Sequence, residues 1–233
     1  MTSFLGFSLP LLWMELVYKE QVEVMQTTSA TPPPKFEGCM IPPHFDLATY
    51  NLSRLAALYH NVGKYFSFTE EMAKTFGCFV YAFDPGLKRT GRRHLERLLF
   101  SPEGINNYTG IINHRRMRTL KDIRHHYGHS NRTIDVITLD ITPTELVVIP
   151  HALENGDLHS VKQLNIRLGN PALILRETAD AYISRLDVLR DLCFFGFRSW
   201  IINEDNKCLF HSEVMHKHVI GCHEISFLNL RYI

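Results

Sequence analysis

The segment from Tyr65 to Pro85 constrains the fold of this chain more than any other stretch. Ser67 begins the S-x-x-E pattern of a helix capping box, and Gly77 supplies the usual stop at the other end of a helix. The apolar run Cys78–Phe83 then predicts a strand buried on both faces, and it ends abruptly on Asp84. A helix followed at once by such a strand is typical of a parallel α/β sheet.

Asp84 is the first residue of the chain that points to a function. In an open α/β sheet, an acid at the carboxyl end of the second strand is placed to hold the hydroxyls of a ribose. Asp84 therefore predicts a cofactor that contains a nucleoside. The alternative is a structural one, because aspartate before proline is also common in turns, where its side chain bonds to its own backbone.

Strand-like and helix-like segments alternate along the rest of the chain. Strands are expected at residues 54–59, 78–83, 134–139, 161–168, 196–202 and 224–230, with a further strand within 104–112. Helices are expected from Ser67 and at 118–127, 144–153 and within 171–193, and the basic stretch 87–99 is interpreted as helical. This alternation predicts an α/β fold with a doubly wound, mostly parallel sheet, finished by a C-terminal antiparallel hairpin.

The length and the N-terminal composition bear on the organisation of the chain. Its 233 residues suit one domain plus a tail. Residues 26–34 are rich in Thr and Pro and predict a linker, so we expect an irregular leader over 1–35 and a single domain over 36–233. The apolar run Phe4–Trp13 lacks a preceding Lys or Arg and is interrupted by Pro10. It leaves open whether the chain is cytoplasmic, or secreted or membrane-anchored through a degraded signal segment.

Charge and cysteine usage exclude some classes of partner and site. The net charge is +1, and the basic run at 88–97 lacks interleaved aromatic residues, so nothing favours nucleic acid as a partner. Membrane association is expected only through the leader. None of the five cysteines forms a C-x-x-C motif, and no metal site is predicted. The dispersed cysteines are compatible with a reducing compartment, but the sequence leaves open whether Cys208 and Cys222 pair.

Several segments resemble one family in order and spacing. Residues 66–70 and 77–85, which read FSFTE and GCFVYAFDP, resemble the methyltransferase domain family typified by methyltransferase-like protein 24. The segments 117–120, 134–140, 156–164, 196–198 and 224–229 follow in the same order, so the resemblance covers about residues 52–229. It implies a class I, Rossmann-like methyltransferase fold, S-adenosylmethionine as cofactor and a methyl acceptor that the sequence does not identify.

The resemblance also implies roles for individual residues. Asp84 would hold the ribose, and Gly63 would lie near the methionine part of the cofactor. Asp140 would hold the cofactor amine, position the substrate or bind a metal; the alternative is a loop acid after a strand. Glu145 matches a motif acid, with a helix-dipole role as its alternative. Asp140 and Glu145 are the candidates for catalysis, although no general base can be named.

The departures from the family pattern favour a second hypothesis. After the first strand only Gly63 remains of a glycine-rich turn, and Thr142-Pro143 replaces an acid and a glycine after Asp140. A chain with these changes could keep the fold as a binding or scaffold protein and lose catalysis, and with it the cofactor. A dinucleotide-binding oxidoreductase is disfavoured, because no G-x-G-x-x-G precedes the first helix.

Overall fold

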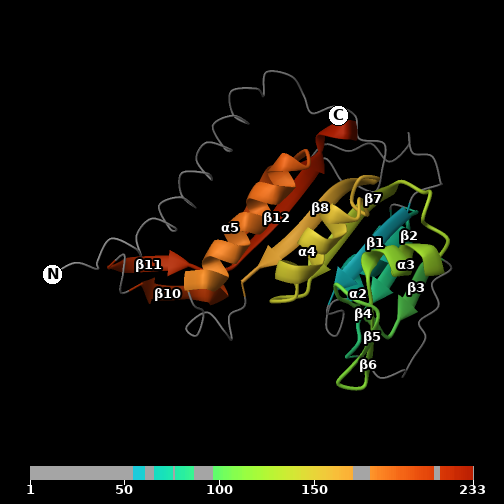
Figure 1. The fold of residues 1–233 in the computed structure, drawn as a ribbon, viewed down its shortest axis with the longest axis horizontal. Helices are drawn as coiled ribbons and strands as arrows, with labels where there is room; N and C mark the ends of the chain where they lie inside the picture. Colours follow the sequence, from blue (N-terminus) through green and yellow to red (C-terminus); the bar gives the residue numbers. More distant parts are fainter. Residues whose placement is uncertain are drawn as a thin grey trace.

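The centre of the molecule is one seven-stranded sheet (Figure 1). The computed structural model describes residues 55–60, 66–75, 77–86, 97–169, 179–212 and 216–232. The strand order in the central sheet is β3-β2-β1-β7-β8-β12-β9. These strands are β1 (Leu55–His60), β2 (Phe79–Phe83), β3 (Leu98–Ser101), β7 (Ile134–Asp140), β8 (Val161–Leu168), β9 (Phe197–Glu204) and β12 (His223–Asn229).

Strand direction divides this sheet into two parts. The five strands β3, β2, β1, β7 and β8 are all parallel to their neighbours. The strand β12 is antiparallel to both β8 and β9. The structure therefore confirms the α/β class and the mostly parallel sheet. The last two predicted strands do pair antiparallel, but they are not a simple hairpin, because another pair of strands lies between them in the chain.

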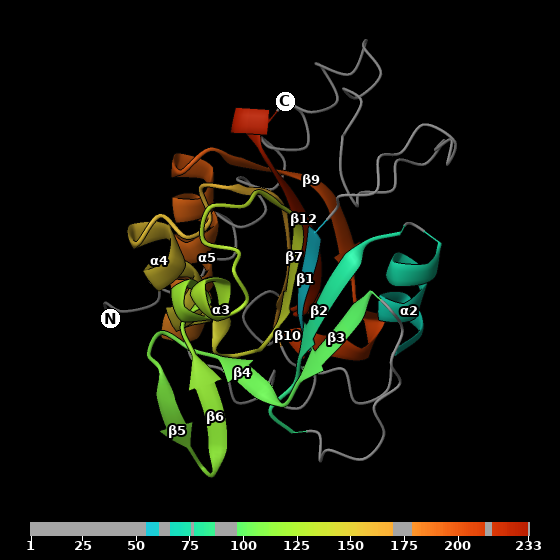
Figure 2. The same cartoon turned by 90° about the vertical axis from the view of Figure 1, so that its right-hand side faces the viewer.

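Helices pack on both faces of the sheet, as Figure 2 shows. On one face lie α3 (Leu120–His126), α4 (Glu145–Glu154) and α5 (Ala179–Phe194), and on the other lies α2 (Phe66–Lys74). Two short 3-10 turns, Asn206–Cys208 and Leu230–Tyr232, complete the described helical elements.

The central strand β7 is largely buried on both faces, which explains why apolar side chains occupy adjacent positions such as Val136 and Ile137. Ile137 lies in the core that β7 and β8 share with α3, α4 and α5. Its neighbour Val136 points to the opposite face and packs in a second core with Met72 of α2. Each fully buried side chain of this size contributes roughly 1.5–3 kcal/mol.

Two small sheets were not predicted. One has three strands, β4 (Glu103–Ile105), β5 (Gly110–Ile112) and β6 (Arg115–Arg118), and the other is the hairpin of β10 (Leu209–Ser212) and β11 (Lys217–Ile220). A strand within 104–112 is confirmed, since β5 lies there, but it belongs to the small sheet, and the third strand of the central sheet is β3 at 98–101. The helical interpretation of 87–99 is wrong for its last residues, and residues 87–96 lie outside the described part. Short strands with few apolar residues form here because a neighbouring backbone offers hydrogen bonds, which sequence periodicity does not report.

Two local predictions around β2 need correction. The helix α2 begins at Phe66, so Ser67 lies within the helix and is not its N-cap. Phe79 is 42% exposed, although β2 was expected to be buried on both faces. The reason is position in the sheet, because β2 lies beside the short edge strand β3 and is covered less completely at its start.

The structure shows whether Cys208 and Cys222 pair, which the sequence left open. Cys208 and Cys222 form a disulfide with a Cα–Cα distance of 5.5 Å. Cys78 is also disulfide-bonded, and Cys193 carries a thiol. The predicted leader and linker at 1–35 lie outside the described residues. In the described part of the chain, no helix combines the length and the apolar character needed to cross a lipid bilayer.

Candidate functional site

The candidate site lies along the edge where the parallel strands reach their carboxyl ends. This edge contains the last residues of β3, β2, β1, β7 and β8, which are Ser101, Phe83, His60, Asp140 and Leu168. The register places them side by side, with Phe83 beside Ser101 and His60 beside Asp140. In open α/β sheets, ligands bind in the crevice outside these carboxyl ends.

The topology singles out one point on this edge. Successive strands add outward from β1 through β2 to β3, whereas β7 and β8 add on the other side of β1. The strand order therefore reverses between β1 and β7, and such a switch point opens a crevice for a ligand. Asp84 follows β2 and Asp140 ends β7, so the two predicted acids lie on either side of the end of β1.

Asp84 is buried, with 3% of its surface exposed. Its Oδ1 accepts a hydrogen bond of 2.7 Å from the backbone N–H of Gly86, which closes the turn over Pro85. Its own N–H donates to the carbonyl of Ser101, which joins the ends of β2 and β3. The turn uses only one carboxylate oxygen. Asp84 therefore has the structural role that the sequence offered as its alternative, and Oδ2 takes no part in that turn.

Aromatic packing holds the end of β2 in place. The ring centroids of Phe83 and Tyr127 are 5.4 Å apart, and those of Tyr81 and His129 are 4.5 Å apart. Burial raises the pKa of Tyr127 above its usual value, against the opposing effect of its hydrogen bond with Ser101. Burial lowers the pKa of His129 to about 4, aided by nearby arginines. His129 is therefore neutral at neutral pH and packs as an apolar ring.

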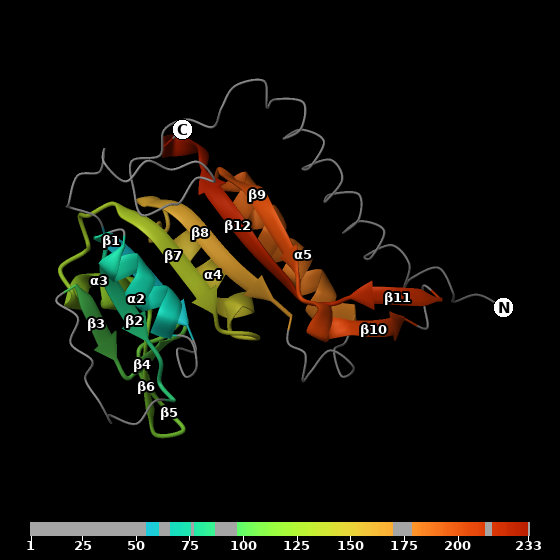
Figure 3. The same cartoon turned by 180° about the vertical axis from the view of Figure 1, so that it is seen from behind.

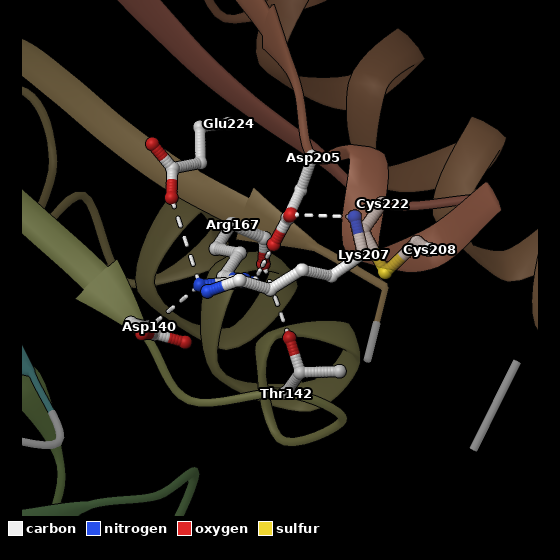
Figure 4. Close-up of a disulfide and its surroundings, with 8 residues drawn as sticks. All are labelled: Asp140, Thr142, Arg167, Asp205, Lys207, Cys208, Cys222 and Glu224. Atoms are coloured by element: carbon white, nitrogen blue, oxygen red, sulfur yellow. Dashed lines mark hydrogen bonds and ion pairs between the residues drawn. A yellow bond between two sulfur atoms is a disulfide. The ribbon is translucent and has the colours of Figure 1, made fainter. Parts of the chain in front are cut away.

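Asp140 lies in a different environment, dominated by Arg167 of β8 (Figure 4). The Arg167 Nη1 atom lies 3.9 Å from Oδ2 of Asp140 and 3.6 Å from Oε1 of Glu224. Its Nη2 atom donates to Oδ2 of Asp205, just beyond β9. One guanidinium therefore joins carboxylates from three segments that are distant in sequence. The Arg167 cluster, as we call these four side chains, carries a net charge of −2 when all are ionised.

The loop after Asp140 also contacts β8. The hydroxyl of Thr142 donates a 3.2 Å hydrogen bond to the Arg167 carbonyl, and the Thr142–Pro143 peptide bond is cis. The residues that replace the family's acid and glycine are therefore fixed against the neighbouring strand.

Glu145 contacts a different arginine, Arg185. It is the first residue of α4 and is fully buried. Its Oε1 lies 4.0 Å from Nε of Arg185 in α5, and Arg185 is itself 4% exposed. This contact links α4 to α5 within the helical layer. Gly63 lies outside the described residues, so the turn after β1 stays a prediction.

Sequence reasoning missed the residues around Asp140. Neither Arg167 nor Asp205 was singled out from the sequence. A charged residue at the carboxyl end of a predicted parallel strand was the available signal for Arg167. No local pattern pairs it with Asp205 and Glu224, because β9 and β12 bring those residues in only after the sheet has formed. Within the described ranges, no group of three or more potential ligands could hold a metal ion.

The residues at the switch point fit the ribose side of a nucleoside cofactor in part. Asp84 provides a buried carboxylate with Oδ2 outside the turn, as ribose binding requires. Asp140 is already engaged by Arg167 at the end of β7. The nucleoside side of the crevice therefore keeps a suitable acceptor, while the side toward β8 is occupied by protein ion pairs.

Comparisons with known proteins find similarity in structure but not in sequence. No family model matches the chain, and no curated protein matches it in sequence. Among solved structures, it is similar to methyltransferase FkbM from Methylobacillus flagellatus KT, with 14% identity over 73% of this chain and 43% of that one, and a TM-score of 0.42. It is also similar to the fibrillarin pre-rRNA processing protein of Methanococcus jannaschii, with 9% identity over 76% of this chain and 66% of that one, and a TM-score of 0.45. The chain spans less than two thirds of either, and at these scores neither likeness carries a functional argument.

Proposed function

We propose that this chain is an S-adenosylmethionine-binding domain with the class I methyltransferase architecture. The observation that carries the proposal is the strand order β3-β2-β1-β7-β8-β12-β9 with β12 antiparallel. In order of appearance along the central sheet this is 3-2-1-4-5-7-6, the layout of class I methyltransferases. The segment resembling methyltransferase-like protein 24 supports the same family, and its Asp84 lies where the ribose would bind.

Two residues of the chain, Asp84 and Gly63, would bind the cofactor. Asp84 would accept a hydrogen bond from the ribose through Oδ2, while Oδ1 keeps the turn with Gly86 closed. Gly63 would let the backbone approach the methionine part of the cofactor. The cofactor supplies an activated methyl group. The protein's contribution to transfer would be mainly to hold donor and acceptor in position.

A second function, a binding or scaffold protein without catalysis, is favoured by the surroundings of Asp140. Its carboxylate lies in an ion pair with Arg167, and Glu145 pairs with Arg185. Neither candidate for catalysis is therefore presented alone toward a substrate. Both functions are compatible with the fold. They differ at the side of the crevice toward β8, which we call the acceptor side because a methyltransferase would hold its methyl acceptor there.

Calorimetric titration of the full chain with S-adenosylmethionine tests the proposal. The informative variant is Asp84→Asn, because the asparagine Oδ1 still accepts from the Gly86 N–H and preserves the turn. We expect wild-type binding and a loss of at least about tenfold in the variant, since a hydrogen bond to a charged group contributes about 1.5–3 kcal/mol. Asp187→Asn on the exposed side of α5 is the matched control and should bind like wild type.

Each outcome decides one part of the proposal. A folded wild-type chain that does not bind the cofactor would overturn the methyltransferase assignment and leave the binding-protein function. Wild-type binding that Asp84→Asn does not weaken would remove the ribose role of Asp84 but keep the cofactor.

The disulfides favour one of the compartments that the sequence left open. Structural disulfides persist in oxidising compartments and are rare in the cytosol. The pair Cys208–Cys222 and the bonded Cys78 therefore support a secreted, lumenal or cell-surface location. Alkylation and mass analysis of the native protein tests this: we expect Cys78, Cys208 and Cys222 to be protected from alkylation, whereas alkylation of all five cysteines would support the cytoplasmic alternative.

A further inference from the structure

The hairpin β10–β11 carries two histidines that face each other across its strands. His211 of β10 lies directly opposite His218 of β11 in the antiparallel register. Their ring centroids are 5.2 Å apart, with an angle of 70° between the ring planes. Directly opposite residues on an antiparallel pair project from the same face of the hairpin. Both side chains are exposed.

We propose that His211 and His218 form a binding site for one late first-row divalent cation, such as Zn²⁺ or Cu²⁺. Neutral imidazole nitrogen is a favoured ligand of these ions. Two imidazoles bound tetrahedrally with metal–nitrogen distances of 2.0–2.1 Å have their ring centroids roughly 5 Å apart. The observed separation of 5.2 Å matches this value, so the two rings are spaced to share one ion.

The hairpin is held in a way that favours such a site. Cys208 directly precedes β10, and Cys222 follows β11 after one residue, so their disulfide closes the open end of the hairpin. Phe210 and Ile220 pack against the disulfide, and the Gly221 N–H donates a 3.1 Å hydrogen bond to the Cys208 carbonyl. The register that opposes His211 to His218 is therefore fixed before any ion binds. Preorganised ligands bind more tightly because less ordering remains to be done.

The position of the hairpin leaves the site accessible. Figures 1 and 3 show β10 and β11 reaching beyond the end of the central sheet. Alternation along β11 places Lys217 on the face opposite His218, so its positive charge does not point at the ion. The site offers two protein ligands, and water would complete the coordination. This binding is independent of the proposed cofactor, which would lie at the switch point between β1 and β7.

Titration of the untagged full chain with ZnCl₂, and separately with CuCl₂, in a chelator-free buffer tests the site. We expect one ion per chain, with Cu²⁺ bound more tightly than Zn²⁺. Mg²⁺ should not bind, because it prefers oxygen ligands. His211→Gln and His218→Gln should each weaken binding by at least about tenfold, since even partners outside the coordination shell contribute 10–100-fold.

The controls separate this pair from the other histidines, since the chain has 13 in all, the pair included. His125→Gln removes an exposed histidine on α3 and should leave the affinity unchanged. Mass analysis of the Cys208–Cys222 bond in each variant shows whether the hairpin is still closed. The proposal is overturned if the wild-type chain binds neither ion, or if the double variant His211→Gln/His218→Gln, with its disulfide intact, binds with unchanged affinity and stoichiometry.

A disulfide variant tests the role of the closed hairpin. Cys208→Ala/Cys222→Ala should bind more weakly than wild type, because the two strands can then separate and shift register. Unchanged affinity in this variant would overturn the preorganisation step of the proposal.

Discussion

The two ends of the carboxyl edge hold their acids in opposite ways. At the end of β2, Asp84 is fixed by its own backbone turn, and the aromatic rings of Phe83 and Tyr127 pack beside it. At the end of β7, Asp140 belongs to the Arg167 cluster, whose members come from β7, β8, β12 and the turn after β9. The β2 end is thus stabilised locally and by apolar contacts, and the β7–β8 end by charges brought together through the fold.

This difference matters for function because the two ends would have different tasks. A cofactor-binding acid benefits from a rigid, preformed position, which the turn provides. In the proposed function the acceptor side determines the chemistry, and the β7–β8 end, which would form that side, holds the ion pairs of Arg167. The comparison therefore predicts that changes at the two ends affect different observables.

The largest effect on stability is expected where β8 meets the connection between β11 and β12. Gly169 has a φ of +87°, and a Cβ there would collide with the Gly221 carbonyl oxygen and lie 3.0 Å from the Cys222 Cα. Gly169→Ala should therefore lower the free energy of unfolding by roughly 2–5 kcal/mol, combining the left-handed backbone cost with overpacking.

The matched control is Gly128→Ala after α3. Gly128 also has a positive φ, of +72°, but a Cβ there meets nothing within 4 Å. We expect a loss of only about 1–2 kcal/mol from the backbone cost alone. Urea denaturation measures the free energy of unfolding of both variants. Equal losses would show that the close approach of the backbone to Gly169 does not contribute to the cost.

Removal of the disulfide is the next largest change. Cys208→Ser/Cys222→Ser opens a loop with a sequence separation of 14, for which loop entropy predicts a loss of about 3 kcal/mol. The control is Cys193→Ser on α5, which should cost less than about 1 kcal/mol. Denaturation without reductant measures both. If the double variant is as stable as the control, the disulfide does not stabilise this end of the sheet.

The β2 end should show a pH dependence through His129. Its pKa of about 4 in the folded state lies below the ordinary 6.5, so the unfolded chain binds more protons between these values. Stability therefore falls as the pH drops through this window, by roughly 2 kcal/mol between pH 7.5 and 5 for the His129 contribution. His129→Gln should remove this part of the pH dependence, measured as unfolding free energy at each pH. An unchanged pH profile in the variant would contradict the assignment.

The smallest effect is expected at the Arg167 cluster, whose members are all partly exposed. Arg167→Gln should cost about 1 kcal/mol, because exposed ion pairs are weak and screened by solvent. The difference in stability between the wild type and Arg167→Gln should shrink at 1 M salt, where the Debye length falls to about 3 Å. Thermal unfolding at low and high salt measures this. A cost that does not change with salt would show that Arg167 acts through packing.

The predictability of the fold differed between the two parts of the sheet. β8 was predicted at its observed bounds of 161–168, and β7 within one residue, because apolar residues recur through both segments and turn residues flank them. β3 was missed, because LLFS follows a basic run and pairs only once β2 offers its edge. The β10–β11 hairpin was missed as well. Its sequence, with histidines and a lysine, lacks the alternation of a typical strand, and the disulfide holds it closed.

The candidate site was predictable to the extent that it depends on strand ends. Asp84 and Asp140 were found because each follows a strong apolar strand. Their surroundings were not predictable, because Arg167 meets Glu224 and Asp205 through antiparallel pairing with β12 and β9.

By itself, the sequence determined the α/β class, the parallel core and the two acids at the ends of β2 and β7. These depend on periodicity and on residues adjacent in the chain. Only the tertiary structure decided that Asp84 closes a turn, that Asp140 pairs with Arg167, that Cys208 bonds to Cys222 and that His211 faces His218. These contacts join segments far apart in sequence, and their geometry exists only once the sheet has set the register of its strands.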